Sequence, residues 1–274
     1  MTSSLFDLTG RVAIVTGAAR GMGRAMAIAL AEAGADLMLA DLNTEGVRNT
    51  ASHIQSLGRR AVPVVGDMSD INHVDALFNQ LDAEFGHIDF LANVAGEGIL
   101  KDPLELTVDD VRLVLQRLVV ARFYACQQAG KRMLAQGRGS IVSLGSIGGA
   151  SALGRGHIAY GMAMAGVIQM TRDLSTEWSG RGVRVNCILP AQVWNPSLEA
   201  RAKANPHMID VWLHGIPRGR FGQPDDIKGL AVLLASDASS WITGAIIPMD
   251  GGNLAMNAGG TRGPAGVEGA AAQD

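Results

Sequence analysis

The stretch RVAIVTGAARGMG at residues 11–23 decides the fold, because a short β-rich run passes directly into glycines that open a helical pattern. Such glycines let the backbone turn sharply and approach a pyrophosphate, and the free N–H groups at a helix start attract its negative charge. A strand before the glycines and a helix after them favour a dinucleotide-binding loop over an ordinary turn. We therefore expect cofactor contacts from the loop residues Gly17, Arg20, Gly21, Met22 and Gly23.

Short β-rich runs alternate with longer helical patterns along the rest of the chain. We predict strands over 11–16, 36–41, 60–65, 88–93, 138–144, 183–189 and 244–248, and helices near 22–34, 44–57, 70–85, 107–135, 157–180 and 224–236. The helical segments are long enough to cross over between parallel strands. This order predicts an α/β fold, a Rossmann-type doubly wound seven-stranded parallel sheet with helices on both faces. Its ligand crevice should open at the carboxyl ends of the strands.

The composition predicts one soluble domain. At 274 residues, with 47% hydrophobic and 18% charged residues, the chain can bury one large core over 1–252, followed by a Gly- and Ala-rich tail over 253–274. A net charge of -3 without a basic cluster gives no attraction to nucleic acid or acidic membranes. The absence of a secretory pattern, a long apolar run or a disulfide framework, with only Cys126 and Cys187, favours the cytoplasm. We expect a small-molecule partner and no metal site.

Asp41 bears on the choice of cofactor, since it closes the second predicted strand about twenty residues after the glycine loop. A carboxylate there accepts hydrogen bonds from the adenine-ribose hydroxyls and repels a 2'-phosphate. Arg20 acts in the opposite sense, because an arginine in the glycine loop can face that phosphate. We expect NAD in preference to NADP.

These segments together resemble the short-chain dehydrogenase/reductase family from about residue 8 to residue 252. The resemblance is carried by TGAARGMG at 16–23, GDM at 66–68, NVAG at 93–96, Ser146, Tyr160, Pro190 and MDGG at 249–252. It implies that Asp67, with Met68 beside it, contacts the adenine, that Asn93, Ala95 and Gly96 line the adenine-ribose side, and that the backbone from Pro190 to Val193 holds the nicotinamide amide. The plainer alternatives are that Asp67 caps a turn and that Pro190 ends a strand.

The resemblance also implies catalytic roles for Ser146 and Tyr160, which lie fourteen residues apart. In the family the tyrosine exchanges a proton with the substrate hydroxyl, and the serine holds the substrate oxygen. A lysine four residues after the tyrosine binds the cofactor ribose and acidifies the phenol, and an asparagine on an earlier helix anchors a water. Here those two positions are Met164 and Leu118, or Arg117 if the register slips by one. Each replacement is compatible with independent drift, but the loss of two groups that act in sequence favours loss of the relay as a unit.

The loss of the relay should affect the two reaction directions differently. An unassisted phenol titrates near pH 10, so it is a poor base at neutral pH but is already a proton donor. Carbonyl reduction can therefore persist more easily than alcohol oxidation. Three polar residues near the expected crevice, His157, Glu97 and Lys101, are candidates for a substitute base or cation, although each also fits a solvated loop position.

The segment from 191 to 221 is predicted to be a substrate lid. Its apolar side chains, Trp194, Met208, Trp212 and Phe221, suit a hydrophobic substrate, or a lid that packs on the core. By resemblance, the helices at 107–135 and 157–180 should form a homodimer or homotetramer interface. Three arginines at intervals of five, Arg112, Arg117 and Arg122, do not form a single stripe, so we expect them at a subunit interface or on a solvated face.

Three functions are compatible with the sequence. The first is a divergent NAD-dependent oxidoreductase that interconverts a hydroxyl and a carbonyl on a hydrophobic small molecule. The second is a lyase, isomerase or cyclase that uses Tyr160 and Ser146 for proton transfer and keeps NAD as a scaffold. The third is a catalytically inactive nucleotide-binding subunit.

Overall fold

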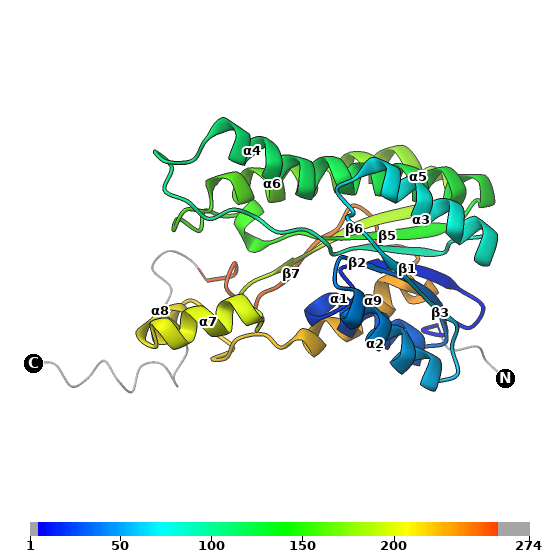
Figure 1. Cartoon of the computed structure of the whole chain (residues 1–274), viewed down its shortest axis with the longest axis horizontal. Coiled ribbons are helices and arrows are strands. Elements are labelled where there is room, and N and C mark those ends of the chain that lie inside the picture. The colour runs from blue at the N-terminus through cyan, green and yellow to red at the C-terminus, as the bar shows by residue number, and fades with distance from the viewer. Residues whose placement is uncertain (1–4, 257–274) are drawn as a thin grey trace, which may run out of the picture.

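A computed structural model describes residues 5–256 and contains a seven-stranded parallel sheet between two layers of helices (Figure 1). The strands lie in the order β3-β2-β1-β4-β5-β6-β7. Their bounds are β1 Val12–Thr16, β2 Asp36–Asp41, β3 Ala61–Val65, β4 Phe90–Asn93, β5 Gly139–Leu144, β6 Val183–Pro190 and β7 Ile246–Met249. The predicted fold class is confirmed, and the strand order reverses between β1 and β4.

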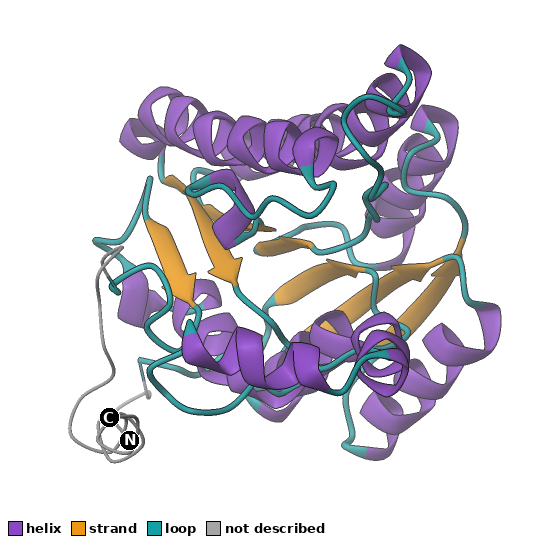
Figure 2. Cartoon of the chain, turned by 90° about the vertical axis from the view of Figure 1, so that its left-hand side faces the viewer, coloured by secondary structure: helices purple, strands orange, loops and turns teal. Residues whose placement is uncertain are grey.

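The helices cover both faces of the sheet, as Figure 2 shows from the side. One layer holds α1 (Gly21–Glu32), α2 (Thr44–Ser56) and α9 (Lys228–Ala235). The other holds α3 (Ile71–Glu84), α4 (Val108–Leu115), α5 (Ala121–Gln136) and α6 (Ile158–Trp178). Two further helices, α7 (Pro196–Ala204) and α8 (His207–His214), lie beyond the carboxyl end of β6.

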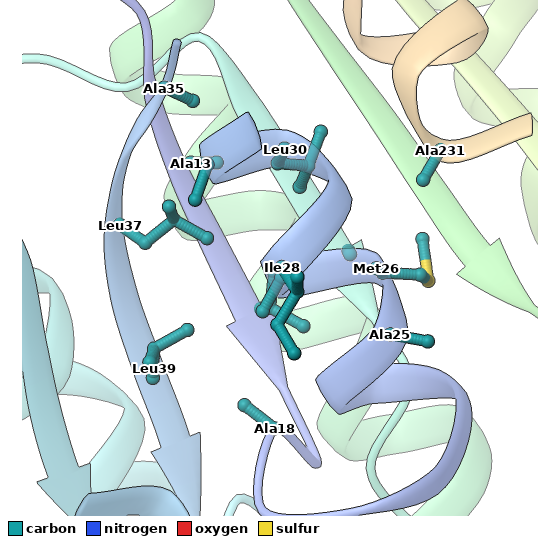
Figure 3. Close-up of a cluster of buried hydrophobic side chains, with 14 of the residues drawn as sticks. Ala13, Ala18, Ala25, Met26, Ile28, Leu30, Ala35, Leu37, Leu39 and Ala231 are labelled. Carbon is teal, nitrogen blue, oxygen red and sulfur yellow. The ribbon is translucent and has the colours of Figure 1, made fainter. Parts of the chain in front are cut away.

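Alternation along the strands explains why both faces are apolar. On β1, Ala13 and Val15 point into the layer of α1, α2 and α9, whereas Val12 and Ile14 point into the layer of α3 and α5. Figure 3 shows the first of these clusters, where side chains of α1 pack against β1, β2 and α9. Because both faces of a parallel sheet are covered, its strands read as nearly continuous apolar runs.

The structure differs from the predicted elements in two places. The single helix predicted over 107–135 is interrupted by a π-helical turn (Gln116–Val120) that separates α4 from α5. The lid over 191–221 contains α7 and α8, for which no helix was predicted. Most of the predicted tail, from 257 onward, lies outside the described residues, as do residues 1–4.

Candidate functional site

A threonine joins the two loops at the point where strand order reverses. The hydroxyl of Thr16 accepts hydrogen bonds from the backbone N–H groups of Val94 (3.0 Å) and Ala95 (3.1 Å). It donates to the carbonyl of Ala92 at 3.3 Å. The glycine loop after β1 therefore lies beside the NVAG loop after β4, as a crevice at the carboxyl ends of parallel strands requires.

The glycine loop is compact because its last glycine is packed against its first. A Cβ atom on Gly23 would lie 2.1 Å from the carbonyl oxygen of Gly17, so α1 can begin this close to β1 only without a side chain there. Gly17 and Gly21 have positive φ angles of 70° and 55°. Arg20 occupies the N-cap position of α1 and is exposed, and Met22 is half-buried. This geometry leaves a helix N-terminus facing the crevice.

Asp41 lies at the end of β2 with its carboxylate turned to the glycine loop. One oxygen accepts from the backbone N–H of Ala19 at 2.9 Å, and the other accepts from Asn43 at 2.8 Å. An ionised carboxylate has about four acceptor positions, so capacity for ribose hydroxyls remains.

The two residues expected to contact the adenine, Asp67 and Met68, lie in the turn after β3. Asp67 is exposed and accepts from the backbone and hydroxyl of Ser69, both at 2.8 Å, so it does cap a turn. The hydrogen bond from the Ser69 backbone, with the charge of Arg117 adding to it, holds the pKa of Asp67 below its ordinary value. Met68 packs against the layer that includes α3. An ionised acceptor at this edge remains compatible with an adenine amine.

The NVAG loop directs its asparagine inward. The buried side chain of Asn93 donates to the Arg122 carbonyl (3.5 Å) and to the Cys126 sulfur (3.2 Å), so its amide points at α5. Ala95 follows, half-buried, and Gly96 has a φ of 125°. Any contact of this loop with a cofactor would therefore come from the backbone and from Ala95 and Gly96.

Ser146 and Tyr160 are positioned by direct packing of a turn on a helix. Ser146 is 7% exposed, and its hydroxyl accepts from the backbone N–H of Gly148 at the start of the 3-10 turn η2 (Ile147–Gly149). A Cβ on Gly149 would lie 2.5 Å from the backbone carbonyl carbon of Met164, so η2 lies against the α6 backbone itself. Tyr160 is in the first turn of α6. The turn that begins after the serine is therefore packed one helical turn from the tyrosine.

The two positions where the family's pattern has polar groups hold apolar residues here, and their surroundings are apolar too. Leu118, in the π-helical turn, and Met164, on α6, are each 1% exposed and belong to one buried cluster. Ile147 and Ala163 pack in the same cluster. Neither residue offers a hydrogen-bonding group to the crevice.

Arg122 is the functional candidate that the sequence reasoning missed. Its assignment to an interface or a solvated face was wrong, since it is 5% exposed. Its guanidinium donates to the carbonyls of Ala95 (3.1 Å), Val94 (3.4 Å) and Leu144, at the ends of β4 and β5. Within residues 5–256, no carboxylate lies within ion-pair distance of it.

Arg122 interacts electrostatically with Tyr160. Burial lowers the pKa of the guanidinium, and Tyr160, Cys187 and Cys126 act in the opposite direction. Arginine nevertheless stays charged at physiological pH. A buried positive charge therefore lies within electrostatic range of Tyr160, on the side of the sheet where Met164 provides none.

The three expected substitutes have different surroundings. The ring of His157 meets that of Tyr160 edge-on at 6.1 Å between centroids, and burial lowers the pKa of His157. Lys101 pairs with Asp110 at 3.0 Å, so its charge is neutralised on α4. Glu97 is exposed in the loop after β4. Of the three, only His157 is seen in contact with Tyr160.

The lid aromatics pack mainly on one another. Trp194 and Trp212 lie 5.0 Å and 6.3 Å from the ring of Phe221, and Met208 belongs to the same cluster. The lid begins where Pro190 ends β6, and Val193 bridges to Gly222. Between them, the Gln192 side-chain oxygen is buried without a hydrogen-bond partner. The lid thus has a small apolar cluster of its own, and the bridge between Val193 and Gly222 joins the two ends of the segment.

Two other features bear on function. Cys126 and Cys187 are free and buried, and burial raises their pKa values to about 12 and about 11. Over the described part of the chain, no group of three or more His, Cys, Asp or Glu side chains could hold a metal ion. No helix there has the length and apolar character needed to span a bilayer.

Known proteins match this chain along most of its length. A family model described as enoyl-(acyl carrier protein) reductase matches residues 17–253. The D-threitol dehydrogenase of Mycolicibacterium smegmatis is 41% identical over 247 residues, covering 90% of this chain and 94% of that protein. The 2-dehydro-3-deoxy-D-gluconate 5-dehydrogenase of Escherichia coli is 35% identical over 259 residues, covering 93% and 100%.

A solved structure from Beutenbergia cavernae, assigned as an NAD(P)-dependent gluconate 5-dehydrogenase, contains NADP at low occupancy. It superposes with a TM-score of 0.87 at 36% identity, covering 92% of this chain and 100% of that one.

Proposed function

The chain belongs to the short-chain dehydrogenase/reductase family, and we propose that it is an NAD-dependent enzyme that interconverts a hydroxyl and a carbonyl on a small molecule. Its relatives are dehydrogenases of a polyol and of a sugar acid, so an oxidoreductase is the shared property. The finer proposal is that redox chemistry persists although Met164 and Leu118 replace the family's lysine and asparagine.

The observation that carries this proposal is the buried guanidinium of Arg122. Burying a cation without a carboxylate partner costs several kcal/mol, even when carbonyls satisfy its donors. We infer that the same charge, which acts electrostatically on Tyr160, stabilises the negative oxygen that develops during proton transfer. Arg122 thus supplies, from α5, the positive field that the family's lysine supplies from α6.

The protein groups then have separate tasks. The bound nicotinamide would supply or accept the hydride. Tyr160 donates a proton to the substrate oxygen during reduction and removes it during oxidation, while the Ser146 hydroxyl donates a hydrogen bond to the same oxygen. His157, whose ring lies against Tyr160, exchanges the proton with solvent. Because burial lowers the pKa of His157, the neutral imidazole is available to accept it near pH 7.

The loops fit a nicotinamide dinucleotide. The partnerless oxygen of Gln192 is an acceptor in the loop expected to hold the nicotinamide amide, whose N–H groups are donors. The Asp41 carboxylate at the glycine loop disfavours a 2'-phosphate, which supports NAD over NADP. The relative from Beutenbergia cavernae contains NADP, so the proposed preference rests on Asp41 of this chain and not on that relative.

Exposed apolar side chains on the expected interface helices support self-association. Leu113, Val120, Phe123 and Met162 are between 41% and 51% exposed on α4, the π-helical turn, α5 and α6. These segments are the ones expected to pair two subunits, so we propose a homodimer or homotetramer. The two unpaired, buried cysteines suit a reducing cytoplasm.

The test is turnover of the full-length protein with NAD and a panel of polyols, sugar acids and apolar alcohols. We expect reduced nicotinamide to form with at least one substrate class, and Tyr160→Phe to abolish it while NAD binding is retained. Chromatography of the products detects the lyase, isomerase or cyclase alternative. Substrate conversion without any change in NAD would overturn the redox proposal, as would a protein that binds NAD but converts nothing.

A further inference from the structure

Two arginines from different parts of the chain share one tryptophan at the lid. The guanidinium carbon of Arg155, in the loop before α6, lies 4.5 Å from the ring centroid of Trp212 on α8. That of Arg201, on α7, lies 5.5 Å from the same centroid. The indole therefore holds two like charges at the junction between the lid and the loop that leads to Tyr160.

These two charges lack a counter-ion. Throughout residues 5–256, no carboxylate lies within ion-pair distance of either guanidinium. The Nε of Arg155 donates to the Leu153 carbonyl (3.3 Å), and that of Arg201 to the Ser197 carbonyl (3.4 Å). The outer edges of both guanidinium forks are therefore free to donate to a ligand. Such a fork matches the two oxygens of a carboxylate or phosphate.

The charges also repel each other. Burial, followed by the charge of Arg201, lowers the pKa of Arg155. An anion bound between them would remove this repulsion, whereas a neutral ligand would leave it in place.

The backbone at Arg155 is held in an unusual conformation. Its φ of 55° is the only positive φ of a non-glycine residue between 5 and 256, and it lies between Gly154 (62°) and Gly156 (75°). The left-handed region is costly for a residue with a Cβ. Such strain is concentrated at ligand sites, where the surrounding structure maintains it. Here the residue with the strained backbone is the one whose guanidinium contacts Trp212 of the lid.

His157 links the loop of Arg155 to Tyr160. It follows Arg155 by two residues, and its ring lies 6.1 Å from that of Tyr160 between centroids. Burial lowers the pKa of His157 most, and the charges of Arg155 and Arg201 lower it further. Arg155 and Tyr160 therefore lie at the two ends of one short segment, with His157 between them.

We propose that Arg155, Arg201 and Trp212 form a subsite for an anionic group of the substrate, which is then a hydroxy or oxo acid bearing a carboxylate, or a phosphate ester. The proposal rests on the proposed function for the reacting end of the crevice, but the anion subsite itself does not depend on redox chemistry. The carbon skeleton of the substrate would lie between the arginines and Tyr160, under the apolar lid.

The experiment has a binding arm and a kinetic arm. Calorimetry on the NAD-loaded protein compares gluconate, glucitol and inorganic phosphate; gluconate and glucitol differ by a carboxylate in place of a hydroxymethyl group. The variants are Arg155→Gln, Arg201→Gln and their combination. Lys203→Gln is the control, because it removes the same charge from α7 at an exposed residue.

We expect gluconate to bind at least tenfold more tightly than glucitol, and either arginine variant to abolish that preference while Lys203→Gln retains it. Displacement of gluconate by inorganic phosphate would identify an oxyanion subsite, and no displacement would restrict it to carboxylates. For any acid that the protein oxidises, the arginine variants should raise KM at least tenfold and change kcat little.

Equal binding of acid and polyol, or an anion preference that survives in the double variant, would overturn the proposal and leave the two arginines as a latch that holds the lid. Anion binding that depends on the arginines, without any reduction of NAD, would retain the subsite and reject the redox function. Thermal unfolding of each variant shows whether loss of binding reflects loss of fold.

Discussion

Leu118 and Met164 are packed in one buried apolar cluster, although they come from the π-helical turn and from α6. Both are 1% exposed. A lysine or an asparagine at either position would therefore face apolar neighbours.

Met164→Lys should therefore destabilise the protein. The ammonium would enter an apolar cluster, and we expect a loss of more than about 2 kcal/mol in the free energy of unfolding. Met164→Leu, which keeps apolar volume, should cost less than about 1.5 kcal/mol. Urea unfolding of the two variants measures the difference. Equal stabilities would mean that position 164 is open to water.

Asp41→Asn should narrow the preference for NAD over NADP. The amide keeps an acceptor for the Ala19 N–H group but loses the charge that repels a 2'-phosphate. We expect the ratio of the two dissociation constants to fall by about tenfold, or about 1.4 kcal/mol. Asp41→Ala should narrow it as well and also loosen the glycine loop. Calorimetry with both dinucleotides checks this, and an unchanged ratio would assign the preference to another residue.

The two cysteines should be inert in the folded protein. Burial raises the pKa of Cys126 to about 12 and that of Cys187 to about 11, so both are protonated thiols at pH 8. Because the thiolate is the nucleophile, a thiol reagent should label neither residue in buffer and both in urea. Mass spectrometry counts the labels. Rapid labelling of either cysteine in buffer would indicate local opening around α5 or β6.

The Arg220–Asp226 pair should stabilise the base of the lid in a pH-dependent way. The hydrogen bond from Arg220 lowers the pKa of Asp226 from 3.8 to about 2. A lowered carboxyl pKa in the folded state gives stability that is present above about pH 4 and is lost as the pH falls toward 2. The pair is largely exposed, so Asp226→Asn should cost under about 1 kcal/mol at pH 6, and less at pH 3.5. Urea unfolding at both pH values, with Asp225→Asn as the control, tests the trend.

Much of the fold could be predicted because local patterns determine it. The β-rich runs in the sequence identified all seven strands. The order of elements also implied that Asp41, at the carboxyl end of β2, lies beside the glycine loop. The lid helices were missed because their apolar side chains are few and serve a small separate cluster. Asn195 followed by Pro196, a helix-start signal, could have revealed α7.

Arg122 could not be placed from the sequence, because its partners are carbonyls of distant loops. Nothing in the sequence around Arg122 distinguishes a guanidinium that meets Val94, Ala95 and Leu144 from one that meets solvent. Its spacing of four from Leu118 puts it on the same helix face, but does not show whether a guanidinium there meets loop carbonyls or solvent.

The rate of NAD reduction by Arg122 variants, measured against pH, tests the central claim most directly. Arg122→Gln keeps donors for the carbonyls and removes the charge, whereas Arg122→Lys keeps the charge. If the charge assists Tyr160, Arg122→Gln should lower alcohol oxidation at pH 7 at least tenfold, about 1.4 kcal/mol in the barrier. The loss should shrink as the pH rises, and Arg122→Lys should recover part of the rate. A folded Arg122→Gln protein that binds NAD and oxidises its substrate at the native rate across this range would contradict the claim.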